Sequence, residues 1–391
     1  MKRILVTFLP LTGIIGIAVF LLSIPSSQSK PSVVSSVSAQ STYPPSTDWY
    51  TLGANPQRTS AVASNPSNIT EIKAVVRPEW FFHISPYISA KVQLIATNDT
   101  IFAASSRGLY AVKTQGVAYD QTTREAPVSS ALKWIYCTST ESNITTGECP
   151  SDELPLGNSP TVIDVNGNGV HTAFVGGFDK RIHAMNANTG DKIWVSAPAE
   201  AGFHTNPLVV QVNGQWMVIA GNRDGKMYFY DANPSNTSQP VAPLGTFQTQ
   251  GPILVSPAFK NNIVYFASND MYAYAVNAAT RAQVWKSAKL PGVGLHSFWP
   301  VVTTQKEPGG VSRDYVIFQG INSWGNLNDD ALDFFGDNSG AGVIDIGARG
   351  TVTSSDPWTT VGTETIDVAK ISDFYVAKPW RRTYFLLNAA D

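Results

Sequence analysis

From about residue 95 onwards, short apolar runs alternate with polar turns along the chain, and no long stretch after residue 40 has helical apolar spacing. The runs are rich in β-branched and aromatic residues, which favour strands. They are TIFAASS (100–106), TAFVGGF (172–178), WMVIAGN (216–222), IVYFASN (263–269) and DYVIFQG (314–320). Because these runs are almost wholly apolar rather than alternating, we expect strands that are buried on both faces.

A second pattern follows the first four runs: an alternating strand, a polar turn and, in most copies, a strand that carries Trp. The copies lie at 106–136, 179–196, 224–243 and 269–287. We expect Trp134, Trp194 and Trp285 to wedge between neighbouring sheets, where burial of each ring stabilises the fold by a few kcal/mol. Small residues recur in the strand before, where they let the next sheet approach: Ala111, Ala184 and Ala273.

The turn between these two strands differs among the copies. Thr189-Gly190 suits a hairpin that needs a left-handed residue, since Gly adopts that conformation without steric cost. The corresponding Thr280-Arg281 does not, so we expect that turn to be looser or differently built.

A third pattern precedes most of the apolar runs and begins with a residue directly before Pro, which is small in most copies. It occurs at 158–164, 205–211, 255–261 and 298–304. Four strands per unit, repeated every 40–60 residues or so, predict an all-β protein: a β-propeller of four-stranded antiparallel blades. Four near-complete units lie at about 90–136, 158–196, 205–250 and 255–287, and a fifth, at 298–391, stops partway.

The repeated strand pair resembles the pyrroloquinoline-quinone (PQQ) repeat, the "lyAlda-TG-xxW" pattern of quinoprotein alcohol dehydrogenase-like propellers. The segment DWYTLGANPQRTSAVAS (48–64) is similar to the opening W…G-x-x-x-x-R-T motif of that family. PEWFFHI (78–84), with Trp80, resembles the lone fourth strand that closes the ring there. Such propellers have seven or eight blades, so the resemblance implies a truncated ring. The alternative is a five-bladed ring completed by the strand around Trp80.

The first 40 residues differ from the rest. Lys2 and Arg3 precede an apolar run, residues 4–24, and a Ser-rich segment follows. This order is typical of a secretory signal peptide, and Val37-Ser38-Ala39 would allow cleavage before Gln40. An uncleaved membrane anchor is the alternative, because the run is long enough to span a bilayer. Both predict export to the periplasm or the extracellular space, with the propeller at 41–391.

The charge of the chain bears on its binding partners, and its cysteines bear on the compartment in which it folds. Beyond the first 40 residues the chain carries 24 basic and 29 acidic side chains, which gives no electrostatic reason to expect nucleic acid. The two cysteines, Cys137 and Cys149, flank a polar loop, and export favours a disulfide between them. The sequons at Asn68, Asn98, Asn143 and Asn236 matter only where the host glycosylates exported proteins.

One loop offers metal ligands. In DVNGNGVHT (164–172), oxygens of Asp164, Asn166 and Asn168 alternate as in a calcium loop, and a backbone carbonyl at Val170 would add a ligand. A turn between two strands explains the same residues, since only one carboxylate is present. DNSGAGVID (337–345) has a similar outline, but Ala341 occupies a ligand position.

Candidate catalytic groups are few. The insertion at about 321–378 contains Asp329, Asp330 and Asp333, any of which could serve as the base of a PQQ- and Ca²⁺-dependent dehydrogenase. The adjacent cysteine pair of known alcohol dehydrogenases of the family is absent. His204 and His296 occupy matching places before the first strands of neighbouring units.

Two functions follow as hypotheses. The first is a binding or scaffolding module of the cell envelope, which holds a protein partner as the envelope assembly lipoproteins built from this repeat do. The second is a PQQ-dependent periplasmic dehydrogenase of alcohols or sugars, which rests on the resemblance alone.

Overall fold

The structure is a computed structural model of the chain. It describes residues 49–60, 82, 84, 88, 92–97, 99–114, 131–290, 294–295, 299–306, 310–321, 360–361, 364–365 and 382–390. The chain divides into two compact units, Met1–Ser38 and Ala39–Asp391, and every described residue belongs to the second. The signal peptide or anchor therefore lies outside the described residues and stays a prediction. Across the described residues, no helix has the length and apolar character needed to cross a membrane.

The second unit is all-β, and each of its large sheets is antiparallel and follows the order of the chain. The first sheet contains β1 (Ile95–Thr97), β2 (Thr100–Ser105), β3 (Gly108–Lys113), β4 (Leu132–Cys137) and β5 (Ser142–Ile144). The second contains β6 (Thr161–Ile163), β7 (Thr172–Gly176), β8 (Ile182–Asn186) and β9 (Lys192–Val195). These sheets are blades 1 and 2.

Blades 3 and 4 repeat the same arrangement. Blade 3 contains β10 (Leu208–Val212), β11 (Gln215–Gly221), β12 (Lys226–Asp231) and β13 (Gly245–Gln248). Blade 4 contains β14 (Ala258–Lys260), β15 (Ile263–Ser268), β16 (Tyr272–Asn277) and β17 (Gln283–Lys286). Both therefore match the four-stranded unit that the sequence predicts.

Blade 5 has three described strands, β18 (Val301–Lys306), β19 (Ser312–Ile321) and β22 (Arg382–Asn388). A separate hairpin, β20 (Thr360–Val361) and β21 (Glu364–Thr365), comes from the insertion between β19 and β22. The rest of that insertion lies outside the described residues, with Asp329, Asp330, Asp333, Asp337 and Asp345.

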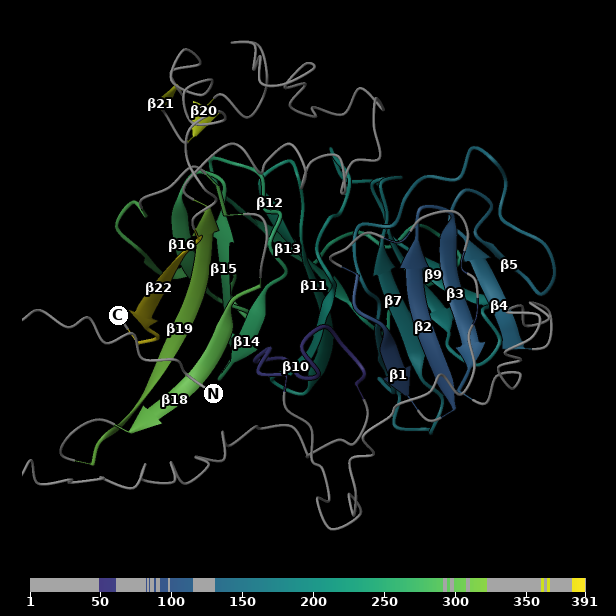
Figure 1. Cartoon of the computed structure of the whole chain (residues 1–391), viewed down its shortest axis with the longest axis horizontal. Helices are drawn as coiled ribbons and strands as arrows, with labels where there is room; N and C mark the ends of the chain where they lie inside the picture. Colours follow the sequence, from purple (N-terminus) through teal and green to yellow (C-terminus); the bar gives the residue numbers. More distant parts are fainter. Residues whose placement is uncertain are drawn as a thin grey trace, which may run out of the picture. The chain divides into compact units, whose positions relative to one another are not determined.

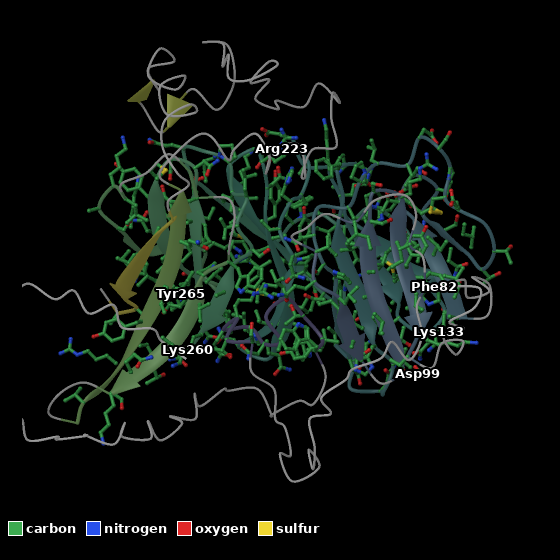
Figure 2. The ribbon with its side chains drawn as sticks, viewed as in Figure 1. Phe82, Asp99, Lys133, Arg223, Lys260 and Tyr265 are labelled. Carbon is green, nitrogen blue, oxygen red and sulfur yellow. A yellow bond between two sulfur atoms is a disulfide. The ribbon has the colours of Figure 1, made fainter. Side chains whose placement is uncertain are left out.

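The hydrophobic core lies between successive blades rather than inside one closed layer. Four clusters of buried residues each combine two neighbouring sheets: blades 1 and 2, 2 and 3, 3 and 4, and 4 and 5. A fifth cluster, which includes Tyr110 and Ile135, covers the other face of blade 1, and Phe82 and Ile84 pack against this cluster. Figure 2 labels Phe82 beside blade 1. Figure 1 shows the sheets in chain order, from β1–β5 at the right to β18, β19 and β22 at the left. This face-to-face stacking of four-stranded sheets is the architecture of a β-propeller.

The predicted tryptophans occupy equivalent positions. Trp134 and Trp194 are each 1% exposed, Trp285 is half-buried, and Trp80 lies outside the described residues. Trp134 stands opposite Ala111 and Trp194 opposite Ala184, each pair next to a β-bulge. In blade 4 Trp285 stands opposite Ala275, and the predicted small residue Ala273 is also fully buried in the cluster between blades 4 and 5. The two alanines are two residues apart and share a face of the strand, so spacing alone could not separate them.

Each of two tryptophans donates its indole N–H to the following blade. Trp194 Nε1 lies 3.1 Å from the carbonyl oxygen of Ala232, and Trp285 Nε1 lies 3.1 Å from that of Ala389. Trp134 instead packs on the turn glycine of blade 2, since a Cβ at Gly190 would lie 2.6 Å from its Cδ2 atom. The Trp strand of one blade thus docks on the segment that follows the third strand of the next blade.

The turn at Arg281 is not differently built, contrary to the sequence prediction. Arg281 has φ 61° and its N–H lies 2.7 Å from the Asn277 carbonyl, as Gly190 N–H lies 2.8 Å from that of Asn186. Blade 3 has Gly245 where blades 1, 2 and 4 have Trp. A Cβ at Gly245 would lie 2.8 Å from Arg281 Cδ, so the arginine side chain occupies the space that an indole fills elsewhere.

Candidate functional site

The segment Trp49–Ser60, called here the hub segment, runs along the first strands of all the blades. These first strands lie next to one another in the order β1, β6, β10, β14, β18. Backbone carbonyls of the segment accept N–H groups from four of them: Trp49 from Ala96, Tyr50 from Val162, Pro56 from Phe259 and Gln57 from Val302. On blade 3, Thr51 Oγ1 reaches Asn206 Oδ1 at 3.2 Å. One short segment therefore ties five sheets together.

Several residues of this segment have an unusual backbone. Gly53 has φ 65°, and a Cβ there would lie 2.9 Å from Arg58 Cα, so the turn excludes any side chain at this position. Ala54, Arg58 and Ser60 also have positive φ, at 65°, 62° and 54°. Each such residue stores of the order of 1 kcal/mol or more of strain, which the surrounding contacts must hold in place.

The residues before the blade prolines meet the hub segment. Thr51, Arg58, Ser159, Thr161, Asn206 and Ser256 form what we call the hub cluster, and all six are at most 3% exposed. Thr51 Oγ1 and Thr161 Oγ1 are 2.7 Å apart, and Thr161 donates to the Pro207 carbonyl at 2.6 Å. Asn206 Nδ2 donates to the Ser159 carbonyl at 2.7 Å. The X-Pro pattern of the sequence therefore marks a buried polar network.

Arg58 provides the charge of this cluster. Its Nε donates to the Pro257 carbonyl at 2.9 Å, and its Nη1 donates to Leu52 O at 2.6 Å and Thr51 Oγ1 at 2.9 Å. Its Nη2 has no hydrogen-bond partner within the described part of the chain, although the side chain is 1% exposed. Burial lowers the pKa of the guanidinium well below its ordinary value, to about 9, and Tyr50 offsets part of this shift, so the group stays charged at neutral pH.

A second arrangement repeats in three blades at the hairpin between the second and third strands. In each blade, one carboxylate oxygen of an aspartate accepts a hydrogen bond from the backbone N–H of the residue two positions later. The other carboxylate oxygen contacts the side chain of the residue four positions later. The pairs are Asp179–His183, Asp224–Tyr228 and Asp270–Tyr274, at 2.7, 2.6 and 2.5 Å. The backbone N–H groups that donate to Oδ1 of these aspartates belong to Arg181, Lys226 and Tyr272. These aspartates therefore shape the hairpins of the propeller.

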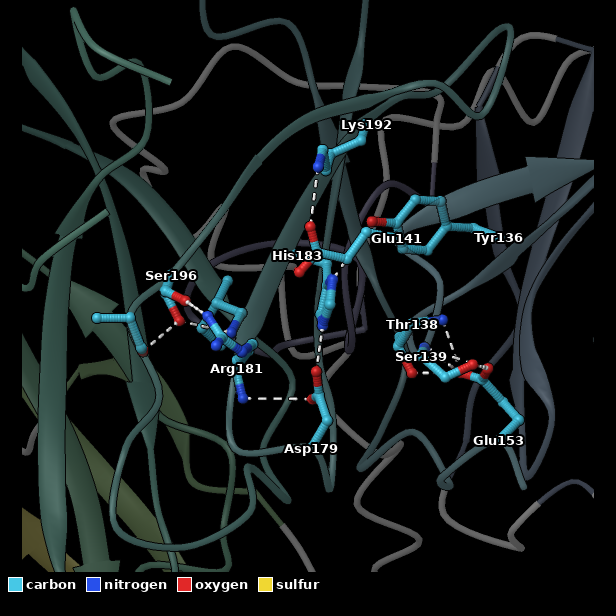
Figure 3. Close-up of polar contacts among 12 residues, drawn as sticks. Tyr136, Thr138, Ser139, Glu141, Glu153, Asp179, Arg181, His183, Lys192 and Ser196 are labelled. Carbon is cyan, nitrogen blue, oxygen red and sulfur yellow. Dashed lines mark hydrogen bonds and ion pairs between the residues drawn. The ribbon is translucent and has the colours of Figure 1, made fainter. Parts of the chain in front are cut away.

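Blade 2 departs from the others by having histidine in place of tyrosine (Figure 3). His183 is fully buried; its Nε2 faces Asp179 Oδ2 at 2.7 Å and its Nδ1 faces Tyr136 Oη at 3.3 Å. The side chain of Asp179 is 17% exposed, so the pair reaches solvent through the carboxylate. Burial, with smaller contributions from nearby acids, raises the pKa of Tyr136, so its hydroxyl remains protonated. The contacts of His183 therefore link the partly exposed carboxylate of Asp179 to the hydroxyl group of Tyr136 in blade 1.

The calcium loop predicted at 164–172 is well ordered by its own backbone. Asp164 accepts the N–H groups of Asn166, Gly167, Asn168 and Gly169. Partial desolvation would raise the pKa of Asp164, but these four donors outweigh it and lower the pKa. Asn168 Oδ1 accepts Val170 N–H, so two of the three expected ligand side chains are committed to the turn. Calcium binding by Asp164, Asn166 and Asn168 stays a prediction.

The predicted disulfide is present, between Cys137 and Cys149. Beside it, Glu153 accepts hydrogen bonds from the backbone and hydroxyl groups of Thr138 and Ser139 (Figure 3). Across the described residues, the one group of three or more potential metal ligands is Cys137, Cys149 and Glu153, and its sulfur atoms are already bonded to each other. This group is therefore occupied as a disulfide, and binding of PQQ or Ca²⁺ stays a prediction.

The remaining candidates are scattered. His204 is fully buried in edge-to-face contact with Phe178, at 4.5 Å between ring centroids, whereas His296 lies outside the described residues. Of the sequons, Asn143 donates its side-chain nitrogen to Thr189 O and Asp191, Asn236 is exposed, and Asn68 and Asn98 lie outside. Sequence reasoning missed both Arg58 and the acid–donor pairs, although an Asp four residues before Tyr or His in three repeats was a usable signal.

Comparison with known proteins gives one curated relative and several distant structures. Over 131 residues the chain is 28% identical to a tetrathionate hydrolase of Acidithiobacillus ferrooxidans, a match that covers 28% of this chain and 25% of that protein. No family model matches. The chain thus matches about a quarter of the length of its curated relative.

Among solved structures, the chain is similar to two quinohemoprotein alcohol dehydrogenases. That of Comamonas testosteroni is 13% identical with a TM-score of 0.49, over 69% of this chain and 46% of the other. Alcohol dehydrogenase IIG of Pseudomonas putida is 14% identical with a TM-score of 0.46, over 69% and 44%. The assignment of the fold rests on the sheets themselves rather than on these similarities.

Proposed function

We propose that the chain is an exported propeller that hydrolyses a small sulfur oxyanion of the polythionate class. The observation that carries the proposal is the 28% identity, over 131 residues, to a tetrathionate hydrolase. In such a hydrolysis water attacks one sulfane sulfur of tetrathionate, a sulfur–oxygen bond forms and the central sulfur–sulfur bond breaks. Thiosulfate leaves with the bonding electron pair, and the other half becomes the hydroxylated anion HOS–SO3⁻. The attacking water loses a proton, which a nearby base must accept.

Asp179 is the described group that suits this proton transfer best. Its carboxylate is partly exposed, and the buried His183 fixes its orientation from behind. Lys180, exposed and next in the chain, supplies a positive charge beside it that attracts an anionic substrate. In this proposal Asp179 takes the proton and His183 is a positioning residue, because it is fully buried and acts through Asp179.

The repeats provide matched variants for the test. Asp179→Asn removes the proposed base, and Asp224→Asn removes the equivalent carboxylate of blade 3, which accepts from Tyr228. His183→Tyr installs the residue that blades 3 and 4 have at this position and so preserves the repeat. Tetrathionate loss and thiosulfate formation are followed by ion chromatography over a range of pH.

We expect wild type and Asp224→Asn to turn over tetrathionate. Asp179→Asn should lower the rate of turnover by about 100-fold or more. His183→Tyr should change the pH profile of the rate as well as its height. Equal activity of Asp179→Asn and Asp224→Asn would remove Asp179 from the mechanism, and no turnover by folded wild type would end the hydrolase proposal.

The two hypotheses from the sequence are tested on the same preparation. Reduction of an artificial dye with alcohols or sugars, after addition of PQQ and Ca²⁺, would support a dehydrogenase. Specific co-purification of an envelope protein would support a scaffold. Neither has a described residue cluster that favours it.

A further inference from the structure

The contact between Tyr136 and His183 has a counterpart at another interface between blades. Tyr136 lies two residues after the Trp position of blade 1, as Phe247 does in blade 3. The rings of Tyr136 and His183 meet edge to face, with centroids 5.7 Å apart and an interplanar angle of 64°. Those of Phe247 and Tyr274 meet in the same way, at 5.7 Å and 67°. The two interfaces therefore hold the same pair of rings and differ in their polar atoms.

The polar atoms differ in a matched way. Between blades 3 and 4, Tyr274 donates its hydroxyl to Asp270, and the facing ring of Phe247 has no hydroxyl. Between blades 1 and 2, the imidazole has two ring nitrogens: Nε2 faces Asp179 Oδ2 at 2.7 Å, and Nδ1 faces Tyr136 Oη at 3.3 Å (Figure 3). The extra nitrogen of His183 thus comes together with an extra hydroxyl on the ring that faces it.

The positions of the protons follow from the partners. A carboxylate oxygen can only accept a hydrogen bond, so Nε2 of His183 carries a proton. The Tyr136 hydroxyl is fully buried, and His183 Nδ1 is the acceptor that the described residues offer it. A proton on Nδ1 would leave the hydroxyl hydrogen buried without an acceptor, which destabilises the folded state. Nδ1 is therefore unprotonated, and the imidazole is neutral.

We propose that Tyr136 donates its hydroxyl hydrogen to Nδ1 of His183 and so keeps the imidazole proton on Nε2, where it binds Asp179 and orients the carboxylate. A shift of this proton to Nδ1 would bring two acceptors face to face at Nε2 and Asp179 Oδ2, and the carboxylate would turn away. In the hydrolysis, a role that rests on the proposed function, Tyr136 is a positioning residue that acts through His183.

The first test locates the protons at neutral pH. In the full chain labelled with ¹⁵N-histidine, two-bond ¹⁵N–¹H correlation spectra separate protonated from unprotonated ring nitrogens, and comparison with His183→Tyr identifies the signals of His183. We expect a protonated Nε2 and an unprotonated Nδ1. A proton on Nδ1, alone or together with one on Nε2, would overturn the proposal. This measurement uses wild type and needs no turnover.

The second test removes the hydroxyl. Tyr136→Phe keeps the ring and gives blade 1 the residue that blade 3 has at this place. The Nδ1 resonance of His183 should move, because the nitrogen loses its donor, and the folded-to-unfolded ratio in urea should fall by about 3- to 10-fold. Phe247→Tyr, the control, adds a hydroxyl to the equivalent ring and should leave the His183 resonances unchanged. An Nδ1 resonance that stays in place in Tyr136→Phe would contradict the hydrogen bond.

A double variant shows whether the hydroxyl acts through the imidazole. Tyr136→Phe combined with His183→Tyr gives blades 1 and 2 the ring pair of blades 3 and 4. In the His183→Tyr background, Tyr136→Phe should therefore leave the folded-to-unfolded ratio unchanged. A loss as large as that in wild type would contradict a role through His183.

The role in hydrolysis is tested separately. Tyr136→Phe should lower kcat for tetrathionate by about 3- to 10-fold and leave KM unchanged, because a fully buried hydroxyl does not contact the substrate. Phe247→Tyr should match wild type. An unchanged kcat in Tyr136→Phe would remove Tyr136 from catalysis while the hydrolase proposal stands. No turnover by folded wild type would end the hydrolase proposal and this role with it, whereas the spectra would still decide the positions of the protons.

Discussion

Docking of the Trp134 ring on Gly190 can be tested with a single methyl group. Gly190 has φ 77°, and a Cβ there would lie 2.6 Å from Trp134 Cδ2. Alanine at this position pays about 1–2 kcal/mol for the left-handed backbone. Displacement of a packed indole adds about 1–3 kcal/mol. We expect Gly190→Ala to lower the free energy of unfolding by about 2–5 kcal/mol in total.

The chain contains a matched control for the backbone contribution. Gly214 has φ 86°, and a Cβ there would meet no atom within 4 Å. Gly214→Ala should therefore lose about 1–2 kcal/mol. Urea unfolding, followed by far-UV circular dichroism, measures both variants. In a Trp134→Leu background the excess loss of Gly190→Ala should shrink, because the smaller side chain can move. Equal losses at Gly190 and Gly214 would refute the proposed contact between blades 1 and 2.

Three further predictions concern the turn, the disulfide and a buried tyrosine. Asp164→Ala should lower the free energy of unfolding, measured in urea, by about 1 kcal/mol, because loop N–H groups lose their acceptor. Replacement of Cys137 and Cys149 by Ser should reduce the free energy of unfolding by about 2–3 kcal/mol, measured in urea, because their loop is short. Burial, then the charge of Asp314, raises the pKa of Tyr265 to about 12, so the folded state holds a proton that the unfolded state releases between about pH 10 and 12. Stability is therefore lost as pH rises through that window, and less steeply in Tyr265→Phe.

The blades were predictable from sequence because their determinants are local. Strand runs, turn residues and the Trp of the fourth strand recur within about twenty residues, and side-chain alternation fixes the faces. Two details of the blades did not follow from the local pattern. Ala273 and Ala275 share a face, so the pattern allowed either as the partner of Trp285. Arg281 was misjudged because its fit depends on Gly245, a residue of another blade.

The candidate sites were less predictable because they depend on long-range contacts. Arg58 meets Pro257, 199 residues away, and no local spacing encodes that pairing. Arg58 belongs to the opening motif of the sequence, but its burial without a charged partner among the described residues depends on how the first strands of the blades pack together. The contact of His183 with Tyr136 likewise joins two blades. In contrast, the Asp179–His183 spacing is local, and comparison of the repeats would have found it.

The most direct test of the account is turnover of tetrathionate by the purified full chain. We expect thiosulfate to accumulate at a rate proportional to protein concentration, with release of protons, and we expect Asp224→Asn to match wild type whereas Asp179→Asn does not. A folded wild-type chain that yields no thiosulfate above a buffer control would contradict it.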